Sequence, residues 1–475
     1  MAVSDPPGPN VPSGTGGSRA VAAALLVAVG LALLPAPAGL PPAGLRAAAI
    51  FAAGLILGVT EAIPLAVTAL LAVALQPVAG VATAPAAFAA FMSPVFFFVL
   101  AMFAIALAFS TTGLARRFAC WLLGRAGGST RRTVTLFMAG TATLSMVISD
   151  VPCAAVFMAI ALGLFDRLGL RRGESAFARA LMVGIPIASL IGGVATPAGS
   201  SVNVLGLFLL EKYGQVHVSF LQWTAVGLPM VVVLVPIAAW AVLWCHPPEM
   251  DRIDGVDFHA ELASLGPLSR QERALLVIGA TMLTFWIVSS WYPAIDTSVV
   301  ALLGAVAMFL PGVGIFRSWK EVENRTAWDS LLMIGGVTSL GAASANSGLA
   351  KWIVDLSMGV VQAWPTAPLI AAISLFIVLI HLAVPVNPAI VAAIVPPVAQ
   401  LALSTGQNPA LYALPVVFTA SCAFLLPLDA VPLVTYGLGY YRPLDMFRPG
   451  ALVSLAWVVL MTAAMLAIGP WVGWL

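Results

Sequence analysis

The chain has 475 residues, of which 61% are hydrophobic and 8% are charged, and its formal net charge is +2. Such a chain has too little polar surface to cover a soluble globule, so the composition indicates a protein that crosses a membrane many times. The charge is close to neutral and the basic residues are scattered near segment ends, which excludes a nucleic-acid-binding face. We expect the lipid bilayer and a small molecule, and no nucleic acid, as partners.

Residues 1–18 are rich in Gly, Pro and Ser and contain no apolar run, so we expect them to form a disordered tail. Eleven apolar segments of spanning length follow in the chain. They lie near residues 19–39, 46–62, 64–82, 93–113, 178–210, 218–245, 272–291, 297–316, 327–345, 409–440 and 449–472. The expected fold is therefore an all-α polytopic membrane protein.

Two further apolar stretches, residues 133–166 and 366–403, are too long for single spans. Each would form a helix of roughly 50 Å, whereas the hydrocarbon core is about 30 Å thick. Basic residues flank the first stretch on both sides: Arg116, Arg117, Arg125, Arg131 and Arg132 before it, and Arg167, Arg171, Arg172 and Arg179 after it. Both of its ends are therefore expected in the cytoplasm. The break at Ser149-Asp150-Val151-Pro152 favours a re-entrant hairpin over two full spans.

This assignment orients the whole chain. It places the N-terminus, residues 246–273, residues 317–325, Arg442 and Arg448 in the cytoplasm. Only Arg46, Lys212 and Lys351 are then left outside, a strong asymmetry of the expected sign. The second hairpin then enters from the opposite face of the membrane, so the two halves are predicted to be inverted repeats. We expect a multi-pass protein of a bacterial-type inner membrane.

The order of motifs supports the repeat. The first half contains Ser-Thr-Thr-Gly-Leu-Ala-Arg-Arg (residues 110–117), the break at residues 149–152, and Gly-Gly-Val-Ala-Thr-Pro-Ala-Gly-Ser-Ser-Val-Asn (residues 192–203). The second half contains Ser-Ala-Asn-Ser-Gly-Leu-Ala-Lys-Trp (residues 344–352), Pro-Val-Asn-Pro (residues 385–388) and Leu-Pro-Leu-Asp-Ala-Val-Pro-Leu (residues 426–433). Broken helices at membrane depth occur where they line a cavity, and paired interruptions point to the binding site of a transporter.

These observations divide the chain into six parts. They are a tail (1–18), scaffold helices (19–92), a first repeat (93–245) with hairpin 133–166 and broken helix 178–210, a cytoplasmic loop (246–271), further scaffold helices (272–326), and a second repeat (327–475) with hairpin 366–403 and broken helix 409–440.

Small polar side chains gather at the breaks of the first half. They are Ser145, Ser149 and Asp150 at the hairpin turn, and Thr196, Gly199, Ser200, Ser201 and Asn203 in the broken helix. Hydroxyls, a carboxylate and freed carbonyl groups are hard oxygen ligands of the kind that a sodium ion prefers, so this cluster is the first candidate ion site. A single serine in a membrane helix more often serves close packing or bonds back to a carbonyl.

The second half offers Asn387 at its turn and Asp429 in the following break. An intramembrane acid is expected either to titrate or to hold a cation, so Asp150 and Asp429 are the two candidate acids. Glu61, near a span end, is as easily explained by an interfacial position. His381 could carry protons, although a lone histidine is more often a packing residue.

The sequence resembles the divalent anion:sodium symporter (DASS) family of the ion transporter superfamily, from Thr60 onwards. The similar segments are Thr-Glu-Ala-Ile-Pro-Leu (60–65), residues 192–203, Ser-Phe-Leu-Gln-Trp (219–223) and Ser-Cys-Ala-Phe-Leu-Leu-Pro (421–427). This resemblance implies a homodimer with a scaffold domain and a transport domain, eleven spans and two hairpins in each protomer, and an elevator movement. It also implies sodium near each hairpin tip and an anion, such as a dicarboxylate or sulfate, between the tips.

We assign candidate residues on this basis. The expected ion-binding residues are Ser145, Ser149, Asp150, Gly199 and Asp429, the first four for sodium. The expected substrate-binding residues are Asp150, Val151, Thr196, Ser200, Ser201, Asn203, Asn387 and Pro388.

The chain departs from the family at both tips. The family carries Ser-Asn-Thr at each tip, whereas this chain has Ser149-Asp150-Val151 and Val386-Asn387-Pro388. The usual Thr-Pro-Pro-Asn of the second broken helix is replaced by residues 430–433, Ala-Val-Pro-Leu. The pocket has lost hydrogen-bond donors and gained a carboxylate, and two unit charges about 4 Å apart repel by about 4 kcal/mol at an effective dielectric near 20. A dianion would bind poorly beside an ionised Asp150.

Several interpretations follow. In the first, sodium or a proton neutralises Asp150 and the substrate is an anion of the carboxylate, sulfate or sulfonate class. In the second, the substrate is a monoanion, a zwitterion or a cation. In the third, proton coupling through Asp429 replaces the second sodium site. We favour one retained sodium site and the loss of the second. A proton-coupled antiporter or efflux permease of the same superfamily is the closest alternative. An intramembrane aspartyl hydrolase using Asp150 and Asp429 is remote, because Leu426-Pro427-Leu428 precedes Asp429 instead of a Gly-x-Gly motif.

Overall fold

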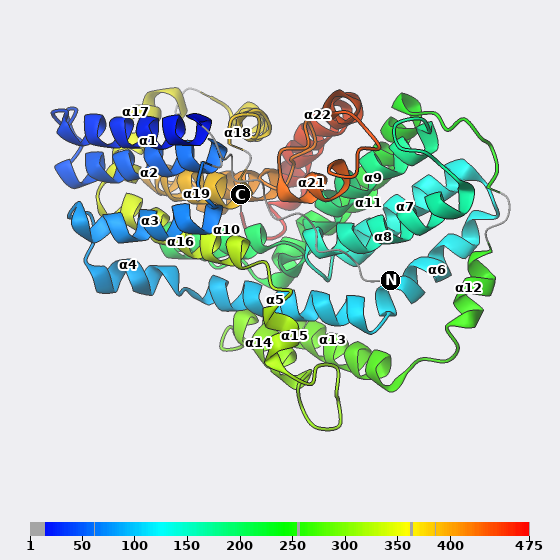
Figure 1. The fold of residues 1–475 in the computed structure, drawn as a ribbon. Helices are drawn as coiled ribbons and strands as arrows, with labels where there is room; N and C mark the ends of the chain where they lie inside the picture. Colours follow the sequence, from blue (N-terminus) through cyan, green and yellow to red (C-terminus); the bar gives the residue numbers. More distant parts are fainter. Residues whose placement is uncertain (1–14, 61, 254–256, 362–363, 385, 475) are drawn as a thin grey trace.

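The structure is a computed structural model that describes residues 15–60, 62–253, 257–361, 364–384 and 386–474, and these residues fold almost entirely as helices (Figure 1). The helices of the first part are α1 Thr15–Leu33, α2 Pro42–Thr60, α3 Leu65–Val78, α4 Ala84–Phe91, α5 Pro94–Thr111, α6 Leu114–Leu123, η1 Gly124–Ala126, α7 Thr130–Ser145, α8 Asp150–Leu168, α9 Ala176–Gly193, η2 Pro197–Gly199, α10 Ser201–Gly214, α11 Phe220–Cys245 and α12 Phe258–Ser264. Those of the second part are α13 Arg270–Val288, α14 Thr297–Ala307, α15 Trp319–Glu323, α16 Trp328–Asn346, α17 Leu349–Val361, α18 Thr366–Ile380, α19 Asn387–Ser404, α20 Pro409–Thr419, α21 Ala430–Tyr436 and α22 Pro443–Ile468.

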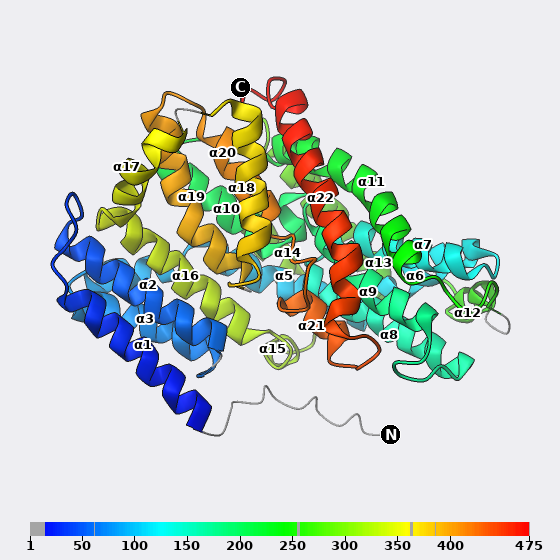
Figure 2. The same ribbon diagram turned by 90° about the horizontal axis from the view of Figure 1, so that it is seen from above.

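The helices have the composition of a multi-pass membrane protein. Within the described ranges, seven helices are long and apolar enough to cross a bilayer, and six shorter ones of 10–17 residues are also apolar. Helices α1, α2 and α3 lie at one end of the molecule and α6, α7, α8 and α12 at the other, in both views (Figures 1 and 2). The broken helices and α22 lie between these two ends.

The predicted repeat of helices is visible in the chain order. The series α5 to α11 recurs as α16 to α22, with breaks at the same places. Each series begins with a sharp turn between its first two helices, at Gly113 (φ 82°) and at Gly348 (φ 83°). Glycine adopts this left-handed conformation without steric cost, which explains the matching Gly-Leu-Ala motifs.

The two long apolar stretches each fold as two helices. The chain turns at residues 146–149 between α7 and α8, and the second turn lies between the end of α18 at Ile380 and the start of α19 at Asn387. Helix α9 packs against both α7 and α8, and its counterpart α20 packs against both α18 and α19. The halves then interlock, because α10 contacts α19 and α20 whereas α21 contacts α8 and α9.

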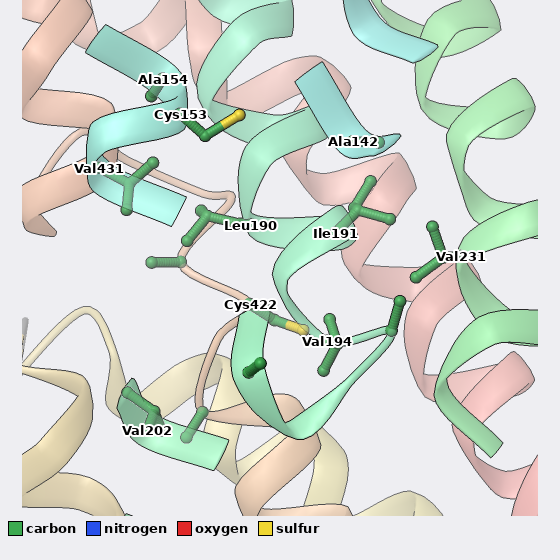
Figure 3. Close-up of a cluster of buried hydrophobic side chains, with 14 of the residues drawn as sticks. Ala142, Cys153, Ala154, Leu190, Ile191, Val194, Val202, Val231, Cys422 and Val431 are labelled. Atoms are coloured by element: carbon green, nitrogen blue, oxygen red, sulfur yellow. The ribbon is translucent and has the colours of Figure 1, made fainter. Parts of the chain in front are cut away.

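Apolar side chains from both halves pack around the end of α9 (Figure 3). Ala142, Leu190 and Val194 of the first half and Cys422 of the second half are almost fully buried in this cluster. This buried apolar cluster lies directly behind the breaks. Its close packing fixes the position of the polar residues in the breaks.

Some expectations differ from the structure. Helix α1 begins at Thr15, inside the predicted tail. The loop 246–271 contains the unpredicted helix α12, which Glu261 anchors through ion pairs with Arg116 (2.7 Å) and Arg167 (3.0 Å). The second break was predicted at residues 426–433, but α21 already begins at Ala430. Residues 1–14 of the predicted tail, Glu61 and Pro385 lie outside the described residues.

The close approach of α7 and α9 gives a stability prediction. A Cβ atom at Gly192 would lie 2.1 Å from the Ala142 carbonyl oxygen, which is backbone and cannot rotate away. We expect Gly192→Ala to lower the free energy of unfolding by about 1–3 kcal/mol, the usual cost of overpacking. Thermal unfolding of the purified protein in detergent measures this effect. Gly279→Ala in α13, where no atom lies within 4 Å, is the control; it should not lower the Tm, because alanine has the higher helix propensity. An equal Tm for both variants would contradict the tight packing.

Candidate functional site

One cavity brings the two turns and the two helix breaks together. Its volume is about 200 Å³, and residues of α2, α3, α5 and α16 supply its remaining wall. The lining residues from the turns and breaks are Ser149, Asp150, Val151, Ala198, Ser200, Ser201, Val202, Val386, Asn387, Pro388, Leu428, Asp429, Ala430, Val431 and Leu433. Residues more than 200 positions apart in the sequence thus share one small space.

Four helices begin at this cavity. The N-terminal residues of α8, α10, α19 and the short helix α21 line it. Proline stands in the first turn of α8 (Pro152), α19 (Pro388) and α21 (Pro432). The first N–H groups of a helix have no partner within that helix, so proline is tolerated there and its fixed φ favours the start. This explains why α21 begins before Pro432 and not after it.

The first turn holds its carboxylate with local hydrogen bonds. The Ser149 hydroxyl (3.2 Å) and the Val151 N–H (2.9 Å) donate to Asp150 Oδ1. Ser189 of α9 donates from its hydroxyl to the Asp150 carbonyl oxygen at 2.7 Å. The Asp150 side chain is therefore fixed at the cavity surface while remaining 7% exposed.

Oxygen atoms crowd together behind Asp150, between the C-terminal ends of α7 and α9. The Ser145 hydroxyl donates to the Ser189 carbonyl oxygen at 2.7 Å and is fully buried. A Cβ at Gly199 would lie 2.5 Å from the Gly193 carbonyl oxygen and 2.8 Å from that of Ser145. A Cβ at Gly193 would in turn lie 3.1 Å from the Gly199 carbonyl oxygen. Glycine at both positions is what allows these oxygens to approach one another.

Two residues predicted to bind the substrate form hydrogen bonds to the backbone around the first break. Thr196 donates from its hydroxyl to the Met146 carbonyl oxygen at 2.6 Å. Asn203 is fully buried, and its Nδ2 donates to the carbonyl oxygens of Gly193 (2.8 Å) and Thr196 (3.0 Å). Its Oδ1 atom is buried without a hydrogen-bond partner. An unpaired buried acceptor is costly, so this oxygen is a further candidate cation ligand.

These residues fit a sodium ion in chemical type. The donor set at the first turn consists of the Ser145 hydroxyl, the Asp150 carboxylate and the carbonyl oxygens of Gly193 and Gly199. All are hard oxygen donors, and the C-terminal ends of α7 and α9 add the negative poles of two helices.

The second turn is built differently. Asn387 begins α19, and its Oδ1 lies 3.1 Å from Nε2 of His381. The Asp429 carboxylate caps α21 by accepting from the Val431 N–H at 3.1 Å. Asn387 and Asp429 both line the cavity, and His381 lies behind them, 5% exposed.

The charge at the cavity comes from two acids and the helix ends. Asp150 and Asp429 are the charged side chains among its described lining residues, and no lysine or arginine is among them. Each helix N-terminus carries roughly half a positive unit charge. The three longer helices, α8, α10 and α19, therefore offset roughly one and a half negative charges. Once a cation neutralises one acid, the cavity favours an anion.

Apolar residues close the cavity on the side of α5 and α16. Phe98, Met102 and Met333 line it, together with the polar Ser330. A second cavity of about 360 Å³ lies beyond Phe98 and Ala198, which belong to both linings. It extends to Glu211 and Lys212 at the end of α10 and to Asp296 before α14.

The structure brings most of the predicted site residues together. Those that line the cavity are Ser149, Asp150, Val151, Ser200, Ser201, Asn387, Pro388 and Asp429. Ser145, Gly199, Thr196 and Asn203 lie behind the surface, as described above. Ser189 and Ser330 were not among the residues predicted from the sequence. A serine within the apolar run of α9 was the available signal for Ser189, whereas nothing in the sequence pattern distinguishes Ser330.

Known proteins are similar in sequence to this chain over most of its length. Residues 18–475 match the family model described as the sodium:sulfate symporter transmembrane region. A protein of Cupriavidus necator described as a membrane protein is 28% identical, over 96% of this chain and 93% of its own length. The sodium-dependent dicarboxylate transporter SdcS of Staphylococcus saprophyticus is 25% identical, over 87% of this chain and 83% of its own length.

A solved structure shows a similar fold. MtrF of Neisseria gonorrhoeae, described as illuminating a class of antimetabolite efflux pumps, aligns with a TM-score of 0.57 at 13% identity. The alignment covers 93% of this chain and 97% of MtrF. At this identity the likeness concerns the fold alone.

Proposed function

This chain belongs to the sodium:sulfate symporter family, the DASS family, whose members are transporters and not enzymes, and from this premise we propose that it moves a small anion across the membrane together with sodium. The observation that carries the proposal is the single cavity at which both turns and both breaks meet. Its volume of about 200 Å³ is below the roughly 300–1,000 Å³ of pockets for drug-sized ligands, so the substrate is small.

The anion binds among the N-termini of α8, α10 and α19. Ser200, Ser201 and Asn387 offer hydrogen bonds there, in place of the tip threonines that the family carries and this chain lacks. Because Asp150 and Asp429 add negative charge, the proposed substrate is a carboxylate, sulfate or sulfonate bound only after a cation has neutralised Asp150. A monoanion suits this balance best.

Sodium binds at the first turn, held by Ser145, Asp150 and Gly199, with Ser149 supporting the carboxylate. Bound sodium would supply the positive charge that allows the anion to approach Asp150. At the second turn the chain lacks the hydroxyls that the family uses, so we propose one sodium site only. Ser189 orients the first turn by bonding to the Asp150 carbonyl oxygen and lying 3.4 Å from the Ser145 hydroxyl.

The proposed architecture has eleven crossings and two re-entrant hairpins, α7–α8 and α18–α19, in two inverted repeats. The basic residues support a cytoplasmic N-terminus in a bacterial inner membrane. In that orientation Gly58, Leu65 and Ser330, which line the site cavity, lie near the cytoplasmic ends of their helices. The hairpins and broken helices are proposed to move as one body past the scaffold helices in an elevator movement, within a homodimer.

Transport by the purified protein in proteoliposomes tests this proposal. We expect an inward sodium gradient to drive uptake of a radiolabelled monocarboxylate or sulfonate, and replacing sodium by choline to abolish it. A panel of mono- and dianions of similar size gives the substrate class. Unchanged sodium-driven uptake of a typical dicarboxylate, with more than one sodium per cycle, would contradict the single-site proposal.

A proton-coupled antiporter or efflux permease is the second candidate, because two buried acids line one cavity. Replacing Asp150 and Asp429 by Asn in separate variants distinguishes the two functions. An antiporter would lose the pH dependence of its flux in one of these variants while remaining independent of sodium. Loss of sodium dependence in Asp150→Asn alone would favour the symporter.

A further inference from the structure

The imidazole ring of His381 lies between two acceptor atoms that cannot donate. Its Nδ1 is 2.7 Å from the Ile377 carbonyl oxygen, and its Nε2 is 2.9 Å from the Ala420 carbonyl oxygen. A carbonyl oxygen is only an acceptor, so each contact requires an N–H on the ring. A neutral imidazole has one N–H and would leave the other carbonyl facing a lone pair; an imidazolium satisfies both.

Two helices end at this ring. His381 is the C-terminal cap of α18, and Ala420 is the C-terminal cap of α20. Each C-terminus carries roughly half a negative unit charge, so the two ends together favour a cation at this point. The ring is 5% exposed, and it lies behind Asn387, whose Oδ1 is 3.1 Å from Nε2.

The charged and titratable side chains around the His381 ring are compatible with a positive charge on the ring. Asp429 and Cys422 line the same small pocket as His381 and are the titratable side chains that face it. Helix α22 also packs on α18, but its charged residues Asp445 and Arg448 lie in its first two turns. At the level of the ring, α22 instead presents Trp457, which donates to the Thr419 hydroxyl at 3.1 Å.

The first half has a different group at the corresponding place. There the ends of α7 and α9 meet around the Ser145 hydroxyl and carbonyl oxygens, and the contacts described for this cluster include no basic side chain. The second half has an imidazole ring between the ends of α18 and α20. The two pairs of helix ends present the same negative pole, and only the second is occupied by a side chain that can carry the positive charge itself.

We propose that His381 is a proton-binding site that takes the place of a second metal cation, so that the transporter couples to one sodium and one proton. A proton taken up on the free ring nitrogen completes both carbonyl contacts and offsets the charge of Asp429. This inference rests on the proposed function for its role in transport, but the protonation of the ring can be measured without any substrate.

The direct test is solid-state NMR of the protein in lipid with ¹⁵N-labelled histidine. The chain has four histidines, and replacing His217, His246 and His259 by Gln leaves His381 as the sole signal without altering the site. We expect both ring nitrogens to be protonated at about pH 6. His246, buried like His381 but with a single carbonyl contact at 2.8 Å, is the matched control in a variant that retains only His246. A neutral ring satisfies the single carbonyl contact of His246, so we expect it to hold the second proton to a smaller extent than His381 under the same conditions.

The second measurement concerns coupling. One cotransported proton raises the steady-state accumulation ratio of the substrate by up to about tenfold per unit of inward pH difference at a fixed sodium gradient. We expect His381→Gln to abolish this dependence while sodium still drives uptake. A neutral ring between about pH 5 and pH 8 would overturn the proposal. So would an accumulation ratio that ignores the pH difference in the wild type, or that still follows it in His381→Gln. Absence of any sodium-driven uptake would refute the proposed function, whereas the NMR result would still stand.

Discussion

Replacing Asp150 by Asn is expected to reduce the apparent affinity for sodium several hundredfold. Asparagine keeps the shape of the side chain and can still accept from the Val151 N–H, so the substitution removes the charge and little else. A unit charge about 4 Å from a cation contributes about 4 kcal/mol at an effective dielectric near 20, which corresponds to this loss. The dependence of the initial uptake rate on sodium concentration measures it.

Asp166→Asn is the matched control, because Asp166 belongs to the same helix but is exposed near its C-terminal end. It should leave the sodium dependence unchanged. A substrate-free measurement complements uptake: sodium should raise the Tm of the wild type relative to choline, because a ligand that binds only the folded state stabilises it. Sodium stabilisation of equal size in Asp150→Asn would exclude the carboxylate from the ion site.

Much of this fold could be predicted from the sequence. Hydropathy located the apolar segments, and the excess length of residues 133–166 and 366–403 indicated a break within each, near Asp150 and Asn387. The second break, predicted at residues 426–433, is shorter in the structure. Pro432 lies within the first turn of α21, where it replaces an N–H that would have no partner, so the helix begins earlier than predicted. Helix α12 was missed because its position depends on the distant Arg116 and Arg167.

The candidate site was predictable in its composition and less so in its geometry. The acids and hydroxyls at the breaks marked Asp150, Asp429 and Ser200 as residues that meet. The sequence could not show that Thr196 and Asn203 face backbone carbonyl groups instead of the cavity. It also could not show that both ring nitrogens of His381 meet carbonyl oxygens, because one of these belongs to Ala420, in another helix. Such contacts depend on how the two halves interlock.

Replacing Gly199 by Ala is expected to abolish sodium binding at the first turn. The added Cβ would lie 2.5 Å from the Gly193 carbonyl oxygen and 2.8 Å from that of Ser145, so both oxygens must move. The Gly193 carbonyl oxygen belongs to the proposed donor set, and a shift of the Ser145 backbone also moves the Ser145 hydroxyl, which is another member of that set. A sodium ion has lost its hydration water in such a site, so displaced ligands leave it without a favourable environment.

The loss should appear in a measurement that needs no substrate. A ligand present at a hundred times its Kd stabilises the folded state by about 2.7 kcal/mol, and this sodium-dependent stabilisation should disappear in Gly199→Ala. Gly163→Ala, in α8 with no atom within 4 Å of the added Cβ, should keep it. Ser145→Ala guards against a folding defect, because it removes one oxygen without adding an atom and should weaken sodium binding only in part. If Gly199→Ala folds and sodium still stabilises it fully, the ion does not lie between the ends of α7 and α9, and the negative poles of these helices serve packing alone.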